Sequence, residues 1–377
     1  MLFLVSPDKF KGSLSAIEVC KAIEKGLYGH KDDIKTVLLP LADGGEGSLS
    51  ILKNYITAKR IIVDVRDPIG KAIKASYLLD GKNAYIELAL ASGLTLLDKA
   101  KRNPMYTTTH GTGELILDAI NRGAKDVFLF VGGSSTNDAG TGILNALGYR
   151  FMDQSGTELY PAGENLIKIC AIENNNLKYN PASVSFYVLS DVKNKLTGLN
   201  GAAYIYAKQK GASRSEIEIL DDGLRNFSKI VKRETGLDIS NVKGGGAAGG
   251  VAAGMYGLAG AEIKSGIDFF IDITEFRKYL EKTDYVVSGE GKLDKQSLQG
   301  KVISKIAQLA KEHNKPLVLF VGKNELPELD LGKLNPFYID DIISHSIDIN
   351  DAMKNSKNHL ENMVKIFLGT DSLFHLY

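Results

Sequence analysis

Glycine residues gather in short clusters beside hydroxyl, lysine and carboxylate side chains. The chain has 39 glycines against 9 prolines. Six loops combine glycine with such groups: residues 7–13, 42–47, 107–114, 132–138, 208–212 and 288–297. Glycine lets several backbone N–H groups converge on one anion, while serine, threonine and lysine add donors and carboxylates can hold a metal ion. A single such loop is typical of a tight turn between a strand and a helix, but six together indicate a phosphate site.

The loops supply the groups that phosphoryl transfer needs. This reaction depends on a phosphate cradle, Mg²⁺, a cation near the transferred group and a carboxylate near the attacking hydroxyl. Lys11 and Lys210 are the candidate cations. The candidate carboxylates are Asp8, Asp43, Asp138, Asp191, Glu290 and Asp294. Any one aspartate alone could equally be a turn former or a helix cap.

One glycine string favours a different chemistry. Residues 244–249 match the dinucleotide pattern G-x-G-x-x-G, and Asp268 falls roughly where the ribose-binding acid would lie. However, residues 238–242 make a poor buried strand, and the Gly/Ala-rich residues after the string suit close helix packing. An NAD-dependent hydroxy-acid dehydrogenase is therefore an alternative to a kinase. A Walker-type site is excluded, because no Gly-x4-Gly-Lys-Ser/Thr string occurs.

Composition limits the partners and the compartment. The 46 basic and 45 acidic side chains leave a net charge of +1, which gives no overall field to attract nucleic acid or an anionic membrane. The apolar run 1–5 is too short for a signal peptide or a membrane span. Cys20 and Cys170 have neither metal-ligand nor disulfide spacing, so we interpret them as buried thiols in a reducing compartment. A cytoplasmic protein is expected.

Elements at the two ends of the chain predict one parallel sheet. Strands are expected at 2–6, 35–40, 284–288 and 317–321. One helix is expected to begin near Ser13 or Ser15 and another to run through 303–312; residues 15–18 match a capping box. Residues 60–90 instead alternate like antiparallel strands. We therefore predict an α/β protein with two domains. They are a discontinuous Rossmann-like parallel-sheet domain, 1–62 and 283–377, and a large inserted mixed α/β domain, 63–282.

Taken in order, the loops closely resemble the bacterial type I glycerate kinases. The matching stretches cover about 320 residues and include 7–16, 42–47, 87–94, 108–116, 132–142, 191–194, 209–212, 246–250 and 289–297. The resemblance implies a two-domain α/β enzyme that phosphorylates D-glycerate with ATP and Mg²⁺. The implied product is 2-phosphoglycerate, although older usage assigns the 3-phospho product.

The sequence departs from the family pattern at a few loop positions. The departures are Lys9, His110, Ser135, Ala139, Lys195 and Lys208. None of them removes a candidate carboxylate, Lys11 or Lys210, so activity is expected to survive. A catalytically inactive metabolite-binding protein is the non-enzymatic alternative.

The resulting site hypothesis assigns a role to each loop. Asp191 is the expected base, because it follows the strand expected at 184–189, and Lys11 and Lys210 are the expected catalytic cations. Asp138 and Asp294 are the expected metal ligands. The residues expected to bind substrate or phosphate are Asp8, Ser13, Asp43, Gly44, Gly45, Glu46, Thr112, Gly113, Gly132, Gly133, Ser134, Thr136, Asn137, Gly289, Glu290 and Gly291. The protein is expected to be a monomer or a homodimer.

Overall fold

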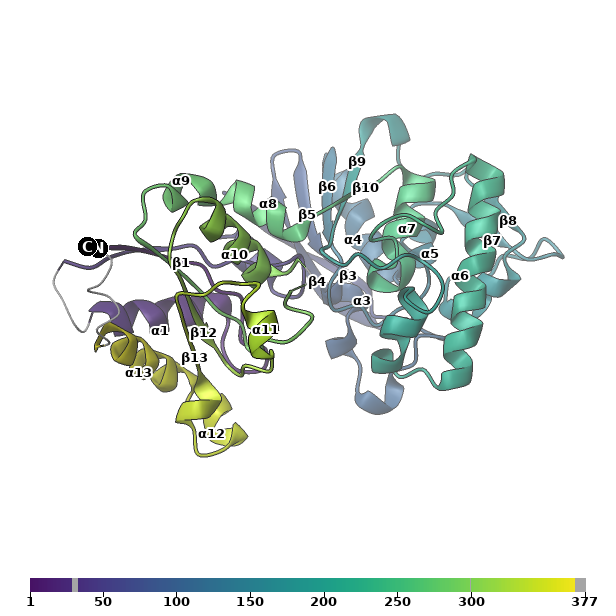
Figure 1. Cartoon of the computed structure of the whole chain (residues 1–377). Helices are drawn as coiled ribbons and strands as arrows, with labels where there is room; N and C mark the ends of the chain where they lie inside the picture. Colours follow the sequence, from purple (N-terminus) through teal and green to yellow (C-terminus); the bar gives the residue numbers. More distant parts are fainter. Residues whose placement is uncertain (29–32, 299, 370–377) are drawn as a thin grey trace. The chain divides into compact units, whose positions relative to one another are not determined.

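The computed structural model describes residues 1–28, 33–298 and 300–369, and the chain divides into two compact units. Unit 1 comprises Met1–Asp43 and Ile267–Tyr377, from the two ends of the chain, and unit 2 comprises Gly44–Gly266 (Figure 1). The sequence placed the boundaries at 62/63 and 282/283 instead. Residues 44–62 go with unit 2 because α2 (Ser48–Leu52) packs on β5 (Asn83–Glu87). Residues 267–282 go with unit 1, where Lys305 pairs with Asp268 at 2.7 Å.

Unit 1 is built on a five-stranded parallel sheet in the order β13-β12-β11-β1-β2. The strands are β1 (Leu2–Val5), β2 (Lys35–Leu38), β11 (Tyr285–Ser288), β12 (Leu317–Val321) and β13 (Tyr338–Asp341). The helices are α1 (Ala16–Tyr28), α8 (Gly266–Ile273), α9 (Phe276–Leu280), α10 (Val302–Glu312), α11 (Glu328–Leu331), α12 (Ile349–Lys354) and α13 (Ser356–Gly369). The parallel sheet predicted from the chain ends is confirmed.

The helices of unit 1 follow from local signals and close packing. The predicted capping box starts α1: Ser15 N donates to Glu18 Oε2 at 2.8 Å, and Glu18 N donates to Ser15 Oγ at 3.3 Å. Helices α1 and α13 pack together at Gly26, where a Cβ atom would lie 2.6 Å from Val364 Cβ. Buried Cys20 belongs to this core, as expected.

Unit 2 contains a six-stranded mixed sheet in the order β10-β9-β6-β5-β4-β3. The strands are β3 (Lys59–Arg66), β4 (Ala72–Asp80), β5 (Asn83–Glu87), β6 (Asp126–Phe130), β9 (Ser185–Leu189) and β10 (Glu262–Lys264); β7 (Arg150–Met152) and β8 (Ala171–Glu173) form a separate pair. Strands β3, β4 and β5 are antiparallel, as the alternation at 60–90 predicts, and β5, β6, β9 and β10 run parallel. Cys170, just before β8, is exposed, so its predicted burial is wrong.

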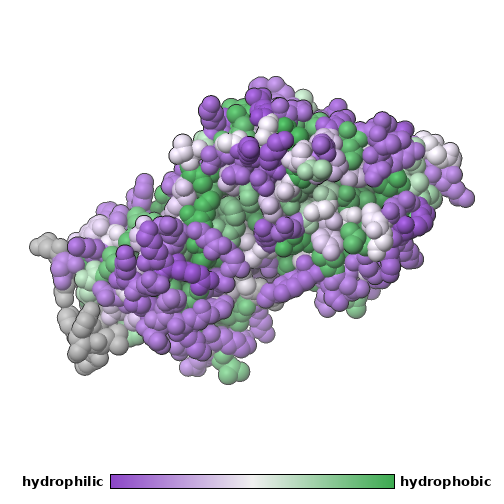
Figure 2. Space-filling model, turned by 90° about the horizontal axis from the view of Figure 1, so that it is seen from above, coloured by the Kyte–Doolittle hydropathy of each residue, from purple (hydrophilic) through white to green (hydrophobic). Residues whose placement is uncertain are grey.

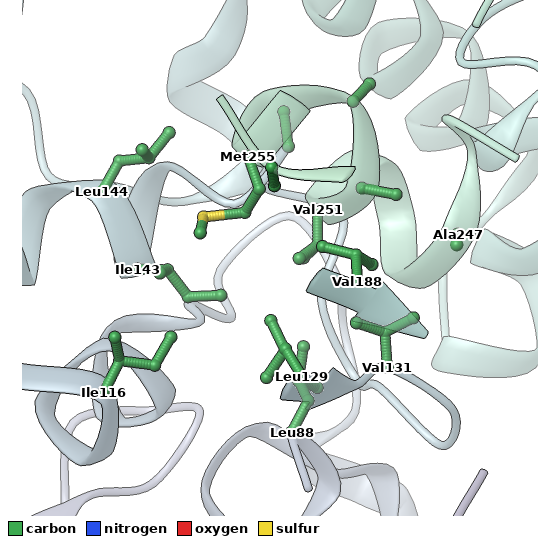
Figure 3. Close-up of a cluster of buried hydrophobic side chains, with 14 of the residues drawn as sticks. Leu88, Ile116, Leu129, Val131, Ile143, Leu144, Val188, Ala247, Val251 and Met255 are labelled. Carbon is green, nitrogen blue, oxygen red and sulfur yellow. The ribbon is translucent and has the colours of Figure 1, made fainter. Parts of the chain in front are cut away.

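The helices of unit 2 share its core with the strands and the loops. They are α2 (Ser48–Leu52), α3 (Ala89–Ser92), α4 (His110–Asn121), α5 (Thr141–Ala146), α6 (Arg214–Thr235) and α7 (Ala247–Ala259). Figure 3 shows side chains from α4, α5 and α7 meeting those of β6 and β9 in one cluster. The labelled members include Ile116, Ile143, Leu129, Val188 and Met255. Burying one such apolar side chain contributes about 1.5–3 kcal/mol to the stability of the folded chain. This cluster therefore holds β6 and β9, whose ends carry the loops of the site.

The glycine string 244–249 has a packing role. Residues 238–242 form no strand, so the context of a dinucleotide-binding loop is missing. A Cβ atom at Gly249 would overlap Thr136 O, and Ala139 N donates to Gly249 O at 3.0 Å. The string therefore lets the start of α7 lie directly against the loop 134–139. This finding removes the structural support for the dehydrogenase alternative.

On the face that Figure 2 shows, hydrophobic residues form several green patches among mostly hydrophilic residues. Within residues 1–28, 33–298 and 300–369, no helix is long and apolar enough to cross a membrane.

Candidate active site

Three carboxylates of unit 1 follow three neighbouring strands of its parallel sheet. Asp8 follows β1, Asp43 follows β2 and Glu290 follows β11. The order β2-β1-β11-β12-β13 makes the gap between β1 and β11 the topological switch point, where ligands bind in open α/β sheets. The loops that carry Asp8 and Glu290 are joined there, because Asp8 N donates to Gly289 O at 2.9 Å.

Two of these carboxylates, Asp8 and Glu290, lie in an environment that disfavours their charge. Burial, followed by the charge of Asp43, raises the pKa of Asp8 to about 7. Burial also raises the pKa of Glu290 to about 7. Glu290 Oε1 is buried without a hydrogen-bond partner in the described part of the chain. A group of buried carboxylates at adjacent strand ends is a candidate site for a bound cation or for proton transfer.

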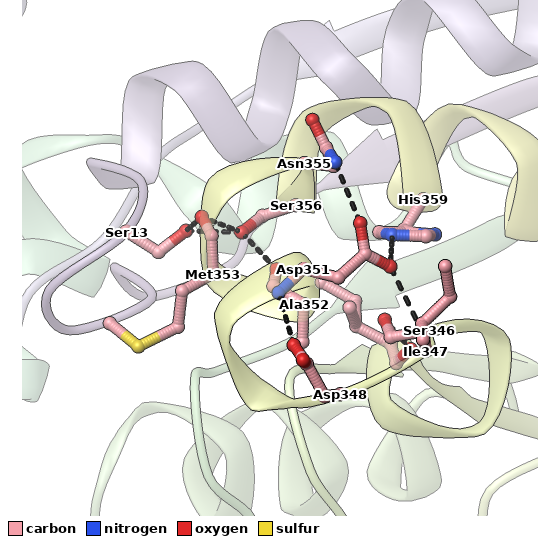
Figure 4. Close-up of polar contacts among 11 residues, drawn as sticks. Ser13, Ser346, Ile347, Asp348, Asp351, Ala352, Met353, Asn355, Ser356 and His359 are labelled. Carbon is pink, nitrogen blue, oxygen red and sulfur yellow. Dashed lines mark hydrogen bonds and ion pairs between the residues drawn. The ribbon is translucent and has the colours of Figure 1, made fainter.

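The loop after β1 is attached to the C-terminal helices of unit 1. Ser13 Oγ donates to Met353 O at 3.1 Å and is hydrogen bonded to Ser356 Oγ (Figure 4). Ser13 therefore uses its hydroxyl to attach the loop to α12 and α13, and we do not assign it to a ligand. Lys11 lies in the same loop and is exposed. No ion pair of Lys11 is present in the described structure.

The glycines and Asp294 of the loop after β11 shape it. A Cβ atom at Gly289 would overlap Phe320 O, and one at Gly291 would lie 3.0 Å from Lys11 N. Asp294 Oδ1 accepts a bond of 2.8 Å from Gln296 N, and its Oδ2 lies 3.8 Å from Lys292 Nζ. The contacts of Asp294 are those of a turn former with a cationic neighbour, and we do not assign a metal to it.

Lys210 and the loop after β6 form the centre of the second group of residues, in unit 2. Lys210 Nζ donates to Ser134 Oγ at 2.7 Å and to Thr136 O at 2.6 Å. The lysine is only 3% exposed. Burial lowers its pKa to about 7, and the charge of Asp138 opposes this shift. The sequence-predicted residues Lys210, Ser134 and Thr136 are thus brought together.

The Asp138 carboxylate, in the same loop, accepts hydrogen bonds from neighbouring residues. It accepts bonds from Thr109 N at 2.8 Å, Thr109 Oγ1 at 2.7 Å, and Gly140 N and Gly142 N at 3.2 Å each. Burial raises its pKa, while these donors lower it. Because both oxygens already accept hydrogen bonds, we do not assign a metal to Asp138. By contrast, the Asn137 amide and Thr136 Oγ1 are buried without a hydrogen-bond partner in the described part of the chain.

The loop 44–47 is held at the same sheet edge by a residue that sequence reasoning missed. Gly132 N donates to Gly44 O at 3.2 Å, and a Cβ atom at Gly132 would overlap Gly45 Cα. The buried carboxylate of Glu87, at the end of β5, accepts bonds from Gly47 N and from Leu49 N, the latter at 3.4 Å. The position of Glu87 at a strand end was the available signal. The predicted residues Gly44, Gly45, Glu46, Gly132 and Gly133 therefore lie on two adjoining loops.

Two other predicted residues of unit 2 lie inside helix α4. Thr112 is fully buried, and its Oγ1 is hydrogen bonded to Ser92 Oγ at 2.7 Å. A Cβ atom at Gly113 would lie 2.6 Å from Ala146 Cβ, so this glycine allows α4 to approach α5. Their contacts are those of helix packing, and we do not assign a ligand to them.

Asp191 follows β9, as predicted, and has a partner that sequence reasoning missed. Ser265, which follows β10, donates from Oγ to Asp191 Oδ1 at 2.7 Å. The two strands are adjacent and parallel, so their carboxyl ends meet at one edge. Strand β10 has only three residues and was not predicted, which is why Ser265 was not found.

Comparisons with known proteins agree along the whole chain. The glycerate kinase family matches residues 3–369. The glycerate 2-kinase of Escherichia coli K12 is 38% identical over 346 residues, covering 91% of this chain and 90% of that protein. The glycerate kinase of Halalkalibacterium halodurans is 37% identical over 321 residues, covering 85% of this chain and 84% of that protein.

A solved structure shares the fold. The crystal structure of a chain from Salmonella typhimurium LT2, a glycerate kinase 2 by name, superimposes with a TM-score of 0.84 at 34% identity and covers 100% of both chains. This α/β protein therefore belongs to the glycerate kinase family.

Proposed function

We propose that the protein transfers the γ-phosphoryl group of ATP to the 2-hydroxyl of D-glycerate, giving 2-phospho-D-glycerate and ADP. The relatives named glycerate kinase and glycerate 2-kinase support the substrate and the position of transfer. The observation that carries the proposal is the group of carboxylates Asp8, Asp43 and Glu290 at three adjacent strand ends of unit 1. In this proposal the enzyme acts in the cytoplasm, where ATP is available.

The carboxylates of unit 1 fit a magnesium ion that arrives with the nucleotide. Within the described residues, no three His, Cys, Asp or Glu side chains are arranged to hold a metal ion by themselves. Mg²⁺ in kinases usually keeps several waters and needs only one or two carboxylates besides the phosphates. The unpartnered Oε1 of Glu290 and the nearby Asp8 and Asp43 meet that requirement. When bound, the ion would neutralise charge on the phosphates.

The residues of unit 2 fit the hydroxy acid. Ser134 provides a hydroxyl for an anionic oxygen, and its Oγ accepts a bond of 2.7 Å from Lys210 Nζ. The unpartnered Asn137 side chain offers both a donor and an acceptor, which a hydroxy acid can satisfy and a fully ionised phosphate cannot. This contrast favours glycerate over phosphate as the ligand of unit 2.

Asp191 is the proposed general base. Its carboxylate takes the proton of the 2-hydroxyl as that oxygen forms a bond to the γ-phosphorus of ATP. The bond between the γ-phosphorus and the bridging oxygen breaks, and ADP leaves with that oxygen. Ser265 holds the Asp191 carboxylate at the end of β9 in the orientation that the structure shows.

Two coupled assays test the function. D-Glycerate and MgATP are supplied, and the product is read through enolase directly or only after phosphoglycerate mutase. A signal through enolase alone supports transfer to the 2-hydroxyl, and a signal that requires mutase would assign the 3-hydroxyl. ADP without either signal would mean another acceptor. Binding of D-glycerate without any ADP would favour the metabolite-binding alternative.

A further inference from the structure

The ammonium group of Lys210, an expected catalytic cation, is buried against the loop after β6. Two of its three N–H donors are used by Ser134 Oγ at 2.7 Å and Thr136 O at 2.6 Å. Its residue exposure is 3%, and that of Ser134 is 7%. The next residue towards the N-terminus, Gly133, is exposed. Ser134 and Lys210 are therefore both buried, and Ser134 directly follows an exposed residue.

The direction of the hydrogen bond determines what Ser134 can do. A lysine ammonium has no acceptor, so the oxygen of Ser134 accepts this bond and the hydroxyl hydrogen of Ser134 points elsewhere. The neighbouring hydroxyl of Ser135 is already used, because its Oγ donates to Ser92 O at 3.0 Å. Thr136 Oγ1 is fully buried. Of the hydroxyl groups of Ser134, Ser135 and Thr136, that of Ser134 has the cationic partner and belongs to the residue with the largest exposed fraction.

We propose that Ser134 donates its hydroxyl hydrogen to an anionic oxygen of the reactants, and that Lys210 is a positioning residue that acts through Ser134 rather than by touching the ligand. A hydroxyl that accepts a bond from a cation is polarised into a stronger donor. This inference rests on the proposed kinase function, because it assumes that an anionic reactant binds at the loop after β6. The anionic oxygen is the carboxylate of the hydroxy acid or the transferred phosphoryl group.

A double-mutant cycle on the full-length protein tests the coupling. Ser134→Ala, Lys210→Gln and the double variant are compared with the wild type by kcat and by KM for D-glycerate and for MgATP. Glutamine keeps a donor and removes the charge. Each single change is expected to lower kcat/KM by about 10- to 100-fold, the usual effect of losing one hydrogen bond to a charged group. The kcat/KM of the double variant is expected to match that of the less active single variant within about threefold. Both changes remove the same interaction, so their effects are not additive.

Matched controls separate this role from support of the fold. Lys208→Gln removes a charge from an exposed neighbour, and Ser135→Ala removes a buried hydroxyl of the same loop. The cycle of Ser135→Ala with Lys210→Gln is expected to be additive. If Lys210→Gln does not fold, Lys210→Arg replaces it, since arginine keeps the charge and alters the geometry of donation. Thermal unfolding identifies variants that are folded.

The dependence of kcat/KM on pH distinguishes the proposed role of Lys210 from a purely structural role in the loop. Loss of the Lys210 proton is expected to produce an alkaline limb in kcat/KM of the wild type, and Ser134→Ala is expected to lack this limb. If Ser134→Ala raises only the KM for D-glycerate, the oxygen that accepts the Ser134 hydrogen belongs to the carboxylate. If it raises the KM for MgATP or lowers kcat alone, that oxygen belongs to the phosphoryl group. Additive losses, or an alkaline limb that persists in Ser134→Ala, would overturn the inference. A wild type without glycerate kinase turnover would instead refute the proposed function.

Discussion

Ser265 Oγ donates a hydrogen bond of 2.7 Å to Asp191 Oδ1, which joins the loops after two adjacent parallel strands, β9 and β10. A hydroxyl that donates to a carboxylate favours its ionised form and fixes its orientation. Both effects serve a general base, which must be ionised and within reach of the proton that it removes. The pair therefore leads to two predictions about the reaction.

Replacing Ser265 with alanine is expected to lower kcat/KM about tenfold, because the Asp191 carboxylate loses the hydroxyl that orients it. Steady-state kinetics measures this loss. Ser265→Thr should retain most activity because it keeps the hydroxyl, and Ser190→Ala, directly before Asp191, is the control. A Ser265→Ala variant as active as the wild type would refute the positioning role.

Replacing Asp191 with asparagine is expected to reduce turnover by about 10²- to 10⁴-fold, because the amide cannot accept the hydroxyl proton. D-Glycerate binding, measured by calorimetry, should persist, since the side chain keeps its shape. Full turnover with an unchanged pH profile would show that another group is the base.

Replacing Glu290 with glutamine is expected to raise the Mg²⁺ concentration needed for half-maximal activity by about tenfold, because an unpartnered carboxylate oxygen becomes a neutral amide. Activity measured against free Mg²⁺ at saturating ATP and D-glycerate gives this value. The exposed Glu312 at the end of α10 provides the control, as Glu312→Gln. Equal Mg²⁺ dependence in both variants would remove Glu290 from the proposed metal site.

Glu87→Gln is expected to reduce the free energy of unfolding by about 1–3 kcal/mol, because a charged acceptor of two backbone N–H groups is replaced by a neutral one. Urea denaturation measures the loss. Glu262→Gln, on the exposed end strand β10, should change the free energy of unfolding by less than about 0.5 kcal/mol. The idea that Glu87 fixes the loop 44–47 fails if the two variants are equally stable.

The titration of Lys210 predicts how stability changes with pH. Its pKa in the folded chain is about 7, below the ordinary value of 10.5. Between these values the unfolded chain binds the proton and the folded chain does not, so the free energy of unfolding rises with pH. At lower pH Lys210 is charged in both the folded and the unfolded chain. The full cost of burying its charge then destabilises the folded chain.

This rise, up to about 5 kcal/mol for a shift of this size, is expected to be absent from Lys210→Met. Guanidinium denaturation at several pH values between 7 and 10 measures the slope. Lys208→Met, an exposed neighbour, should keep the wild-type slope. If wild type and Lys210→Met have parallel slopes, the lysine does not titrate in this range.

Local sequence patterns determined the secondary structure around the site. The apolar runs gave β1, β11 and β12, the alternation at 60–90 gave the antiparallel strands, and Ser15 and Glu18 gave the start of α1. These features depend on the period of side-chain burial and on hydrogen bonds between residues close in sequence, so they can be read from the chain alone. For the same reason the position of Asp191 after β9 was predictable.

Partners far apart in sequence were decided only by the tertiary structure. Ser134 and Lys210 are 76 residues apart, and Asp191 and Ser265 are 74 apart. Residue type could mark Lys210 as a cation and Asp138 as a carboxylate, but it could not show that one lies beneath Ser134 or that the other accepts four bonds from its own loops. Burial and partner choice depend on how β6, α4 and α7 pack together. The sequence by itself thus determined which groups are available for chemistry, and the packing decided which of them face a ligand and which hold the loops in place.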